Sequence, residues 1–389
     1  MNTEKLFDEA PYDRDFRAAI TDIIKTKEGR TGLILDRTLF FPEEGGQSCD
    51  KGTIGEFEIT HVSIENEIIV HETDAPFDAF SKGDQVKGVI DWDHRFSNMQ
   101  NHTGEHILSG LLHRDFGSEN MGFHLSDNIV TLDTSKVLTQ DQLQELERKA
   151  NEVVYADLPV FCRYYTKEET DGIDYRSKLE LDDNIRLVVI PGVDICACCA
   201  PHVKHTGEIG LIKIIKAINY KGGMRFSILS GRRAYEYVSE ECRRVDDLTH
   251  ILSEKRENLI TAVNRLLEKN ESYRLEKIEN AKKMLEAQVE KIDDSAKDAV
   301  IFVEEVNDIT QRNAVNDLAA KHNGICGVFS GNDSDGYRYI ISIPGGDARE
   351  ASNILKEKLQ AKGGGSKEMV QGSVNARKDI IMEALNGRR

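Results

Sequence analysis

Short apolar runs, separated by turn residues, mark the first part of the chain as β-rich. The runs are rich in β-branched residues, as is typical of strands, and lie at 20–25, 31–35, 55–62 and 68–71. Glycine and polar residues interrupt them, for example at Gly45-Gly46 and at Lys82-Gly83-Asp84. Several short strands at this spacing predict a small β-barrel over residues 1–95.

The apolar period becomes helical at Arg95 and stays helical to about Phe116. Residues 96–235 as a whole are predicted to form a helix packed on an antiparallel sheet. The further elements are a strand at 129–132, a helix at 139–157 that starts with a capping box of Thr139 and Gln142, and strands at 185–190 and 208–217. The cysteine cluster at 196–199 is therefore expected on the connection between the last two strands.

A charged, glycine-poor stretch follows over 236–295. Its apolar residues fall near heptad spacing, at Val245, Leu248, Leu252, Leu259, Val263 and Leu266. This pattern predicts a long, partly coiled helix or a helical hairpin that spaces two domains or joins two subunits. A solvated connector helix is the alternative.

The last block, 296–389, alternates strands with helices and predicts a small α/β domain. Its strands are expected at 299–303, 325–330 and 337–343, and its helices at 309–322, 347–361 and 378–385. The whole chain is thus predicted to be an α+β, multidomain protein with a barrel, a helix-and-sheet core, a helical linker and a C-terminal α/β domain.

Composition limits the class of protein. The 389 residues, 39% of them hydrophobic, suffice for two or three domains. No apolar run approaches the roughly 20 residues that span a bilayer, and the amino terminus does not resemble a secretory signal. We therefore expect a cytoplasmic protein without a membrane partner. The net charge of −17 argues mildly against a general RNA-binding protein, although a local basic patch can still bind RNA.

Two short motifs carry candidate metal chemistry. His102 and His106 lie four residues apart, so a helix places them on one face, and Cys198 is followed four residues later by His202. Imidazole and thiolate ligands favour zinc. We predict one zinc ion per chain, bound by His102, His106 and Cys198, with His202 either as the fourth ligand or close by. Seven cysteines, an odd number, fit a metal site in a reducing compartment better than a disulfide framework.

Glu105 lies between the two histidines, and a role as general base is one interpretation. On a helix, however, it points about 100° away from His106. A role next to the ligands or a position in solvent is therefore the preferred interpretation.

Four blocks of sequence resemble the editing domain of alanyl-tRNA synthetases and its free-standing AlaX-type relatives of the long form. They are F-F-P-E-E-G-G-Q at 40–47 with D-K-G at 50–52, H-T-G-E-H at 102–106, C-C-A-P-H at 198–202 with T-G-E-I-G after it, and G-G-G-S at 363–366 with M-V-Q-G at 369–372. The last block is similar to the DHHA-type domain that closes those synthetases. The segment before the zinc helix does not resemble an aminoacylation module.

The resemblance implies a zinc-dependent hydrolase that removes wrongly attached serine or glycine from alanine tRNA. It also implies that the amino-acid pocket is lined by Gln47 and by Asn120, Met121, Gly122, Phe123 and His124. A structural turn at Gln47 and a core strand at 120–124 are the alternatives. Gln47 and Asp50 are expected to shape the junction between barrel and core.

The partner implied is the acceptor end of tRNA(Ala), with a homodimer through the long helix or the C-terminal domain as a further expectation. Candidate contacts to the RNA backbone are Arg232, Arg233, Lys362 and Lys367. Two other functions stay open. One is a tRNA-binding or assembly module in which zinc is structural, and the other is a deacylase for another aminoacyl-tRNA such as Ser-tRNA(Thr).

Overall fold

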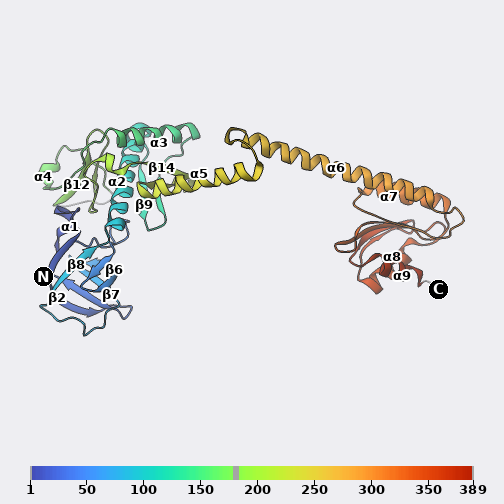
Figure 1. The fold of residues 1–389 in the computed structure, drawn as a ribbon, viewed down its shortest axis with the longest axis horizontal. Coiled ribbons are helices and arrows are strands. Elements are labelled where there is room, and N and C mark those ends of the chain that lie inside the picture. Colours follow the sequence, from blue (N-terminus) through green and yellow to red (C-terminus); the bar gives the residue numbers. More distant parts are fainter. Residues whose placement is uncertain (1, 178–183, 388–389) are drawn as a thin grey trace. The chain divides into compact units, whose positions relative to one another are not determined.

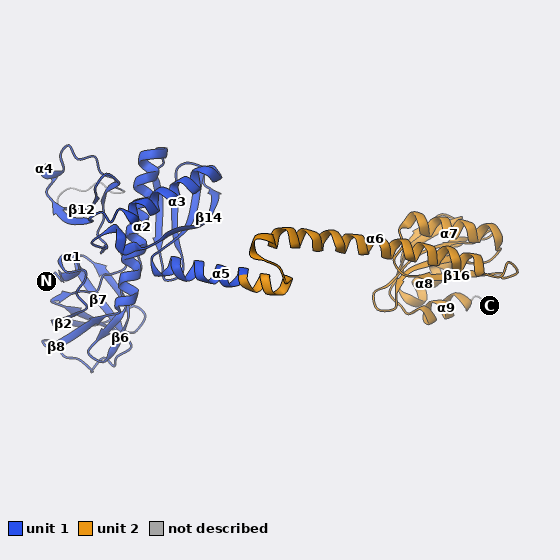
Figure 2. Ribbon diagram, turned by 45° about the horizontal axis from the view of Figure 1, so that its top comes forward, with its two compact units in different colours: residues 1–245 blue, residues 246–389 orange. Residues whose placement is uncertain are grey.

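The computed structural model describes residues 2–177 and 184–387 and contains two compact units, residues 1–245 and 246–389 (Figure 2). Helices and several separate sheets occur in it, which confirms the α+β, multidomain class. Residues 178–183 of the predicted core and the last two residues of the predicted C-terminal domain lie outside the described residues. The finer division at 95, 235 and 295 stays a prediction.

The first strands of unit 1 close into a barrel with the order β2-β3-β7-β6-β5-β8 (Figure 1). Their bounds are β2 Asp15–Lys25, β3 Thr31–Leu35, β5 Gly52–Ile54, β6 Phe57–Glu65, β7 Ile68–Thr73 and β8 Gln85–Ile90. Apolar side chains such as Leu33, Ile54, Val62 and Ile69 fill its interior and are fully buried. Beside the barrel, β1 (Glu4–Lys5) pairs in parallel with β4 (Arg37–Thr38), and the short helix α1 (Leu6–Glu9) follows β1.

One buried histidine lies inside the barrel. Its two ring nitrogens are both satisfied: His71 Nδ1 donates to the Leu33 carbonyl at 3.0 Å, and Nε2 accepts from the Thr38 hydroxyl at 2.8 Å. The Leu33 carbonyl can only accept, so Nδ1 carries a proton, and the Thr38 hydroxyl, which accepts from Phe40 N, has its own proton to donate to Nε2. Burial lowers the pKa of His71 from 6.5 to about 4.

This histidine predicts a pH dependence of stability. Below pH 6.5 the unfolded chain binds the His71 proton before the folded chain does, so its contribution to stability is complete above that pH and is lost as the pH falls towards about 4. We expect the free energy of unfolding to fall by about 2 kcal/mol more in wild type than in His71→Gln between pH 7.5 and pH 5. Urea unfolding at the two pH values measures this difference. Equal pH dependence in both proteins would contradict it.

Helix α2 (Trp92–Phe116) leads from the barrel into the rest of unit 1 (Figure 1). It begins three residues before the predicted start because the Asp91 side chain caps it, accepting from His94 N at 3.1 Å. Gly117 ends it in the left-handed conformation, with φ 57°. Side chains on every side of its central turns are buried, which places both predicted zinc histidines inside the fold.

A four-stranded antiparallel sheet packs against α2, in the order β14-β15-β10-β9. Its strands are β9 Asn120–Leu125, β10 Val130–Thr134, β14 Ile212–Tyr220 and β15 Gly223–Ser230. The predicted strand at 208–217 starts later than expected, because Thr206–Ile209 form a 3-10 turn. Helix α3 (Gln140–Tyr155) starts with the predicted capping box, in which Gln142 N donates to the Thr139 hydroxyl at 3.3 Å.

A second, three-stranded sheet carries the cysteine cluster and has the order β11-β12-β13. Its strands are β11 Phe161–Tyr165, β12 Ile185–Ile190 and β13 Asp194–Ala197, and the short helix α4 (Lys167–Thr170) follows β11. The expectation that the whole cluster lies on a connection is wrong for Cys196, which is part of β13 and pairs with Val188. Cys198 and Cys199 come directly after the strand.

The predicted helical stretch is interrupted. Helix α5 (Arg232–Leu252) ends at a turn in which Ser253 has φ 48°, and α6 (Leu259–Lys291) begins after the short 3-10 segment Arg256–Asn258. The prediction of a single continuous helix is therefore wrong. The heptad-like residues Leu248 and Leu266 are 46% and 52% exposed.

Unit 2 contains a five-stranded sheet in the order β16-β17-β18-β20-β19. The strands are β16 Ala299–Val303, β17 Cys326–Asn332, β18 Gly336–Ser342, β19 Lys362–Gly365 and β20 Met369–Val374, and the helices are α7 Asp308–Lys321, α8 Ala348–Leu359 and α9 Lys378–Asn386. The predicted α/β alternation is present, and the hairpin of β19 and β20 adds to it. Among the described residues, none of the helices has the length and apolarity that crossing a bilayer requires.

Candidate metal centre and its cleft

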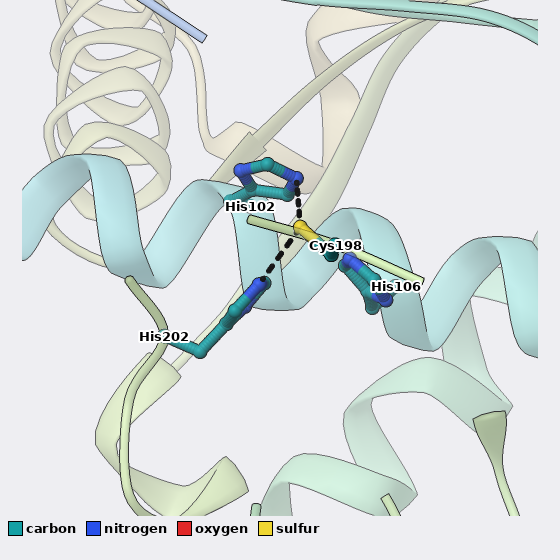
Figure 3. Close-up of side chains that lie close together, drawn as sticks. All are labelled: His102, His106, Cys198 and His202. Carbon is teal, nitrogen blue, oxygen red and sulfur yellow. Dashed lines mark hydrogen bonds between the residues drawn. The ribbon is translucent and has the colours of Figure 1, made fainter. Parts of the chain in front are cut away.

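Four side chains that lie far apart in the sequence converge on one point (Figure 3). His102 and His106 come from consecutive turns of α2, and Cys198 and His202 come from the segment after β13. One nitrogen from each histidine and the Cys198 sulfur all lie within 4.8 Å of one another. Cys198 Sγ is 3.6 Å from His102 Nε2 and 3.4 Å from His202 Nε2.

Each of the three imidazoles is held by a hydrogen bond at its other nitrogen. The Nδ1 partners are Gln47 Oε1 for His102 at 2.7 Å, Asp194 Oδ2 for His106 at 2.9 Å and Thr103 Oγ1 for His202 at 3.0 Å. Because the Thr103 hydroxyl donates to the Met99 carbonyl, it accepts from His202. Each ring therefore carries its proton on Nδ1 and its lone pair on Nε2, the nitrogen that could bind a metal ion, and the partner fixes the orientation of the ring.

Burial shifts the pKa values of two members of the cluster, His202 and Cys198. His202 is 2% exposed, and burial, followed by its neighbours His106 and His102, holds its pKa well below the ordinary value. Burial likewise raises the pKa of the Cys198 thiol well above the ordinary value. A metal ion reverses that balance for a coordinating thiol, because a bound cation favours the thiolate. Three imidazoles and one cysteine are the donor set of a zinc site.

Cys198, rather than Cys196 or Cys199, joins the three histidines, as the spacing predicted. Cys196 forms a second group with His106 and Asp194, whose ligand atoms also lie within 4.8 Å of one another. Asp194 there already accepts from Arg176 Nε and Nη2, both at 2.8 Å. Its carboxylate therefore serves as the anchor of His106.

Two glycines bring Gln47 to the cluster. Gly45 and Gly46 have φ values of 62° and 83°, in the left-handed region that favours glycine. A Cβ on Gly46 would lie 2.5 Å from the Phe123 carbonyl of β9. This close approach places Gln47, which is 1% exposed, against His102.

Removal of this anchor has an expected effect on metal binding. Gln47→Ala leaves His102 Nδ1 without its acceptor, and we expect the affinity for zinc to fall by about 10- to 100-fold. Gln47→Glu keeps an acceptor and is expected to retain most of the affinity. Competition with a chromophoric chelator measures both, with the neighbouring Ser48→Ala as control. Unchanged affinity in Gln47→Ala would show that the contact does not orient the ligand.

A cleft of about 1520 Å³ opens beside the cluster, within unit 1. His102, Glu105 and His106 of α2 line it, together with residues of the 44–46 turn and of all three strands of the second sheet. Of the predicted pocket residues, Asn120 and Phe123 also line it, and the Phe123 ring lies 4.7 Å from that of His102. Met121 is instead 67% exposed, and Gly122 and His124 are not among the described residues that line the cleft.

Glu105 does not lie in solvent. It is 3% exposed and accepts hydrogen bonds from the Ser109 hydroxyl and from Asn120 Nδ2, the latter at 2.7 Å. Glu105 is therefore buried beside the group of four side chains, and its predicted role next to the ligands stays a prediction. Asp50 lies at the junction of barrel and core, where it pairs with Arg95.

The four predicted RNA contacts have different surroundings. Arg232 is 61% exposed and pairs with Asp93 and Glu236. Arg233 is half-buried and donates to the Ser126 carbonyl and to Asn98. Lys362, on β19, and Lys367, in the turn after it, are exposed.

The barrel, the histidine helix and the sheets surround four side chains that could hold a metal ion, and they match modules of aminoacyl-tRNA synthetases. Residues 13–94 match the family "tRNA synthetases class II (A)", and residues 185–227 match the "Threonyl and Alanyl tRNA synthetase second additional domain". The chain is 32% identical to the alanyl-tRNA editing protein AlaX-L of Pyrococcus horikoshii over 271 residues, which are 68% of this chain and 67% of that protein. The chain belongs to the family of alanyl-tRNA editing proteins.

Alanine–tRNA ligases are also similar to the chain. That of Pyrobaculum neutrophilum is 29% identical over 404 residues, which cover 98% of this chain and 44% of the ligase. That of Pyrobaculum aerophilum is 34% identical over 288 residues, 69% of this chain and 31% of the ligase. The chain thus spans less than half the length of these ligases.

Proposed function

We propose that the chain is an aminoacyl-tRNA hydrolase that edits in trans, deacylating Ser-tRNA(Ala), Gly-tRNA(Ala) or both. The observation that carries the proposal is the convergence of His102, His106, Cys198 and His202 at a cleft in a member of the alanyl-tRNA editing family. A cleft of this size accommodates the aminoacylated end of a tRNA. The proposed role implies a cytoplasmic location, where tRNAs are charged.

The four ligands would hold a single zinc ion. We propose His102, His106 and Cys198 as ligands because of their spacing in the two motifs. We propose His202 as the fourth ligand, because its Nε2 lies as close to Cys198 Sγ as that of His102 does. A zinc ion bound there supplies positive charge that can activate a water or polarise an ester carbonyl. The three imidazole rings are held in their orientations by hydrogen bonds to Gln47, Asp194 and Thr103.

The chain's own cleft residues would do the remaining work. Phe123 packs on the His102 ring and shields that side of the cluster from bulk water. Glu105 and Asn120 supply polar groups on the same wall. The reaction needs a water about 3 Å from the ester carbon and a donor for the oxyanion.

The partner would be the acceptor end of tRNA(Ala). Lys362 and Lys367 are exposed without an ion pair among the described residues and remain our choice for backbone contacts. Arg232 and Arg233 would have to leave their present partners to bind phosphate. Residues 296–389 are proposed as a DHHA-type domain, and a homodimer through α6 or that domain stays a prediction.

The experiment that tests the function is deacylation by the purified protein. We expect serine or glycine to be released from tRNA(Ala) while Ala-tRNA(Ala) is spared. Ser-tRNA(Thr) serves as the comparison, because one matched family model is shared with threonyl-tRNA synthetases. Faster cleavage of Ser-tRNA(Thr) would move the assignment to the threonine system, and survival of every ester would overturn the hydrolase.

A second candidate is a tRNA-binding module with structural zinc. The observation that favours it is the set of four protein donors, since a closed tetrahedral shell is typical of structural sites. A structural site supplies folding energy, so this candidate predicts loss of the circular dichroism signal of unit 1 when zinc is removed, with no deacylation before removal.

A further inference from the structure

A buried carboxylate on the wall of the cleft is not used by the metal cluster. Glu105 is 3% exposed and lines the cleft between the ligands His102 and His106. Both of its hydrogen bonds, from Ser109 and from Asn120, go to the same oxygen, Oε1. Among the described residues no donor bonds to Oε2, so half of a buried carboxylate is left for a ligand.

A second acceptor without a donor lies next to it. Asn120 Oδ1 is buried and has no hydrogen-bond partner among the described residues. Asn120 Nδ2 is fixed by its bond to Glu105, which turns Oδ1 away from that bond. The wall of the cleft thus carries the Asn120 amide oxygen, which has no partner, and the Glu105 Oε2 atom, which has no donor among the described residues.

A cation in the same cleft, Arg176, is paired with another carboxylate. Its two guanidinium contacts are both with Asp194, at 2.8 Å. No ion pair joins Arg176 to Glu105 among the described residues. The pair of Glu105 and Asn120 is therefore complementary to a group that carries several donors and a positive charge.

We propose that Glu105 and Asn120 bind the α-ammonium group of the aminoacyl ester, so that they position the ester at the metal centre and select esters with a free amino group. The proposal rests on the proposed function and names the recognition element of that substrate. An ammonium has three donors and no acceptor, which matches two acceptors.

This role differs from that of a general base. A base must take a proton from the attacking water, and its loss would slow every ester equally. An ammonium anchor acts only on ligands that carry the ammonium. Glu105 is thus a positioning and specificity residue, and its signature is discrimination between two isosteric ligands.

The test uses two stable ligands that differ only at that group. In 3′-glycylamino-3′-deoxyadenosine an amide replaces the ester, and in 3′-propionylamino-3′-deoxyadenosine a methyl group replaces the ammonium. Calorimetry with the zinc-loaded full chain is expected to show that wild type binds the glycyl ligand about 10- to 100-fold more tightly, as for hydrogen bonds to a charged group. Glu105→Gln is expected to abolish most of that preference and to leave the affinity for the propionyl ligand unchanged.

Two controls keep the result interpretable. Glu119→Gln removes a negative charge from the same cleft, where Glu119 pairs with His113, and should keep the preference. Measuring the zinc content and the unfolding midpoint of Glu105→Gln shows whether the adjacent ligand His106 is damaged. A further variant, Glu105→Asp, keeps the charge and is expected to retain part of the preference for the glycyl ligand.

The outcomes separate this inference from the proposed function. Equal affinity of wild type for both ligands, or an equal loss for both in Glu105→Gln, overturns the ammonium site even if the protein deacylates Ser-tRNA(Ala). A preference that depends on Glu105 supports the site, whereas absence of deacylation in wild type overturns the hydrolase and leaves the binding result standing.

Discussion

Cys198→Ala is expected to lower kcat/KM for deacylation of Ser-tRNA(Ala) by more than about 100-fold. Loss of a residue that merely orients a metal ligand costs about 10- to 100-fold, and loss of a ligand should cost more. Cys198 is the only sulfur in the four-residue group and lies 3.4 Å and 3.6 Å from two of the imidazoles. Binding of the tRNA body should change little, because the cysteine lies at the cleft wall rather than on an exposed surface.

Single-turnover kinetics and filter binding measure the two properties. Cys242→Ala is the matched control, since Cys242 is an exposed cysteine on α5, away from the four-residue group. Zinc content should fall in Cys198→Ala and stay at one per chain in the control. Full deacylation by a folded Cys198→Ala protein would mean that the reaction does not use this centre.

Arg95→Ala is expected to destabilise unit 1 by about 3–5 kcal/mol. Arg95 and Asp50 are both fully buried and form an ion pair. Arg95 Nε donates to Asp50 Oδ1 at 2.9 Å, and its other nitrogens donate to the carbonyls of Leu39 and Pro11. Removing one member leaves a buried charge without compensation, which is the costly change for such a pair.

The urea midpoint of the unit 1 transition measures this effect. Arg17→Ala is the control, because Arg17 is exposed on β2 and should cost less than about 0.5 kcal/mol. The double variant Asp50→Leu/Arg95→Met should be more stable than Arg95→Ala, since both charges are gone. A destabilisation of Arg95→Ala below about 1 kcal/mol would show that water or a rearranged partner satisfies Asp50.

The convergence of the four side chains could be predicted because each pair is local in sequence. Four-residue spacing on a helix fixes the relative position of His102 and His106. The same spacing selected Cys198 with His202 over the neighbouring thiols, which the convergence of the four side chains supports. The elements around them followed from apolar periodicity, as at β3, β12 and β16, whose predicted bounds agree with the structure.

The anchors of the imidazoles were not predictable in the same way. Asp194 and Thr103 act only through tertiary contacts with His106 and His202, and no spacing rule connects Asp194 with a residue 88 positions away. The one feature of the sequence that could have pointed to Asp194 and Thr103 is that each lies within a few positions of a proposed ligand. Glu105 shows a related limit, because its helical position indicated the direction away from His106 but not that β9 would bury that direction.

Irregular strands account for other differences. The hairpin of β19 and β20 begins with Lys362-Gly363-Gly364-Gly365, a sequence that reads as a loop because glycine is depleted in strands. The strand β19 is held in place by its backbone pairing with β20, because its glycines have no side chains that could pack. Cys196 was expected in a loop for a similar reason, since β13 has only four residues and is held by its register with β12.

The most direct test of the account is deacylation of Ser-tRNA(Ala) by the zinc-free protein and after zinc is restored, with circular dichroism recorded at each step. The account predicts that activity is lost on removal of zinc and returns with one equivalent per chain, while Ala-tRNA(Ala) is spared throughout. Undiminished deacylation by folded, zinc-free protein would contradict the claim that the cluster of His102, His106, Cys198 and His202 is the centre of the reaction.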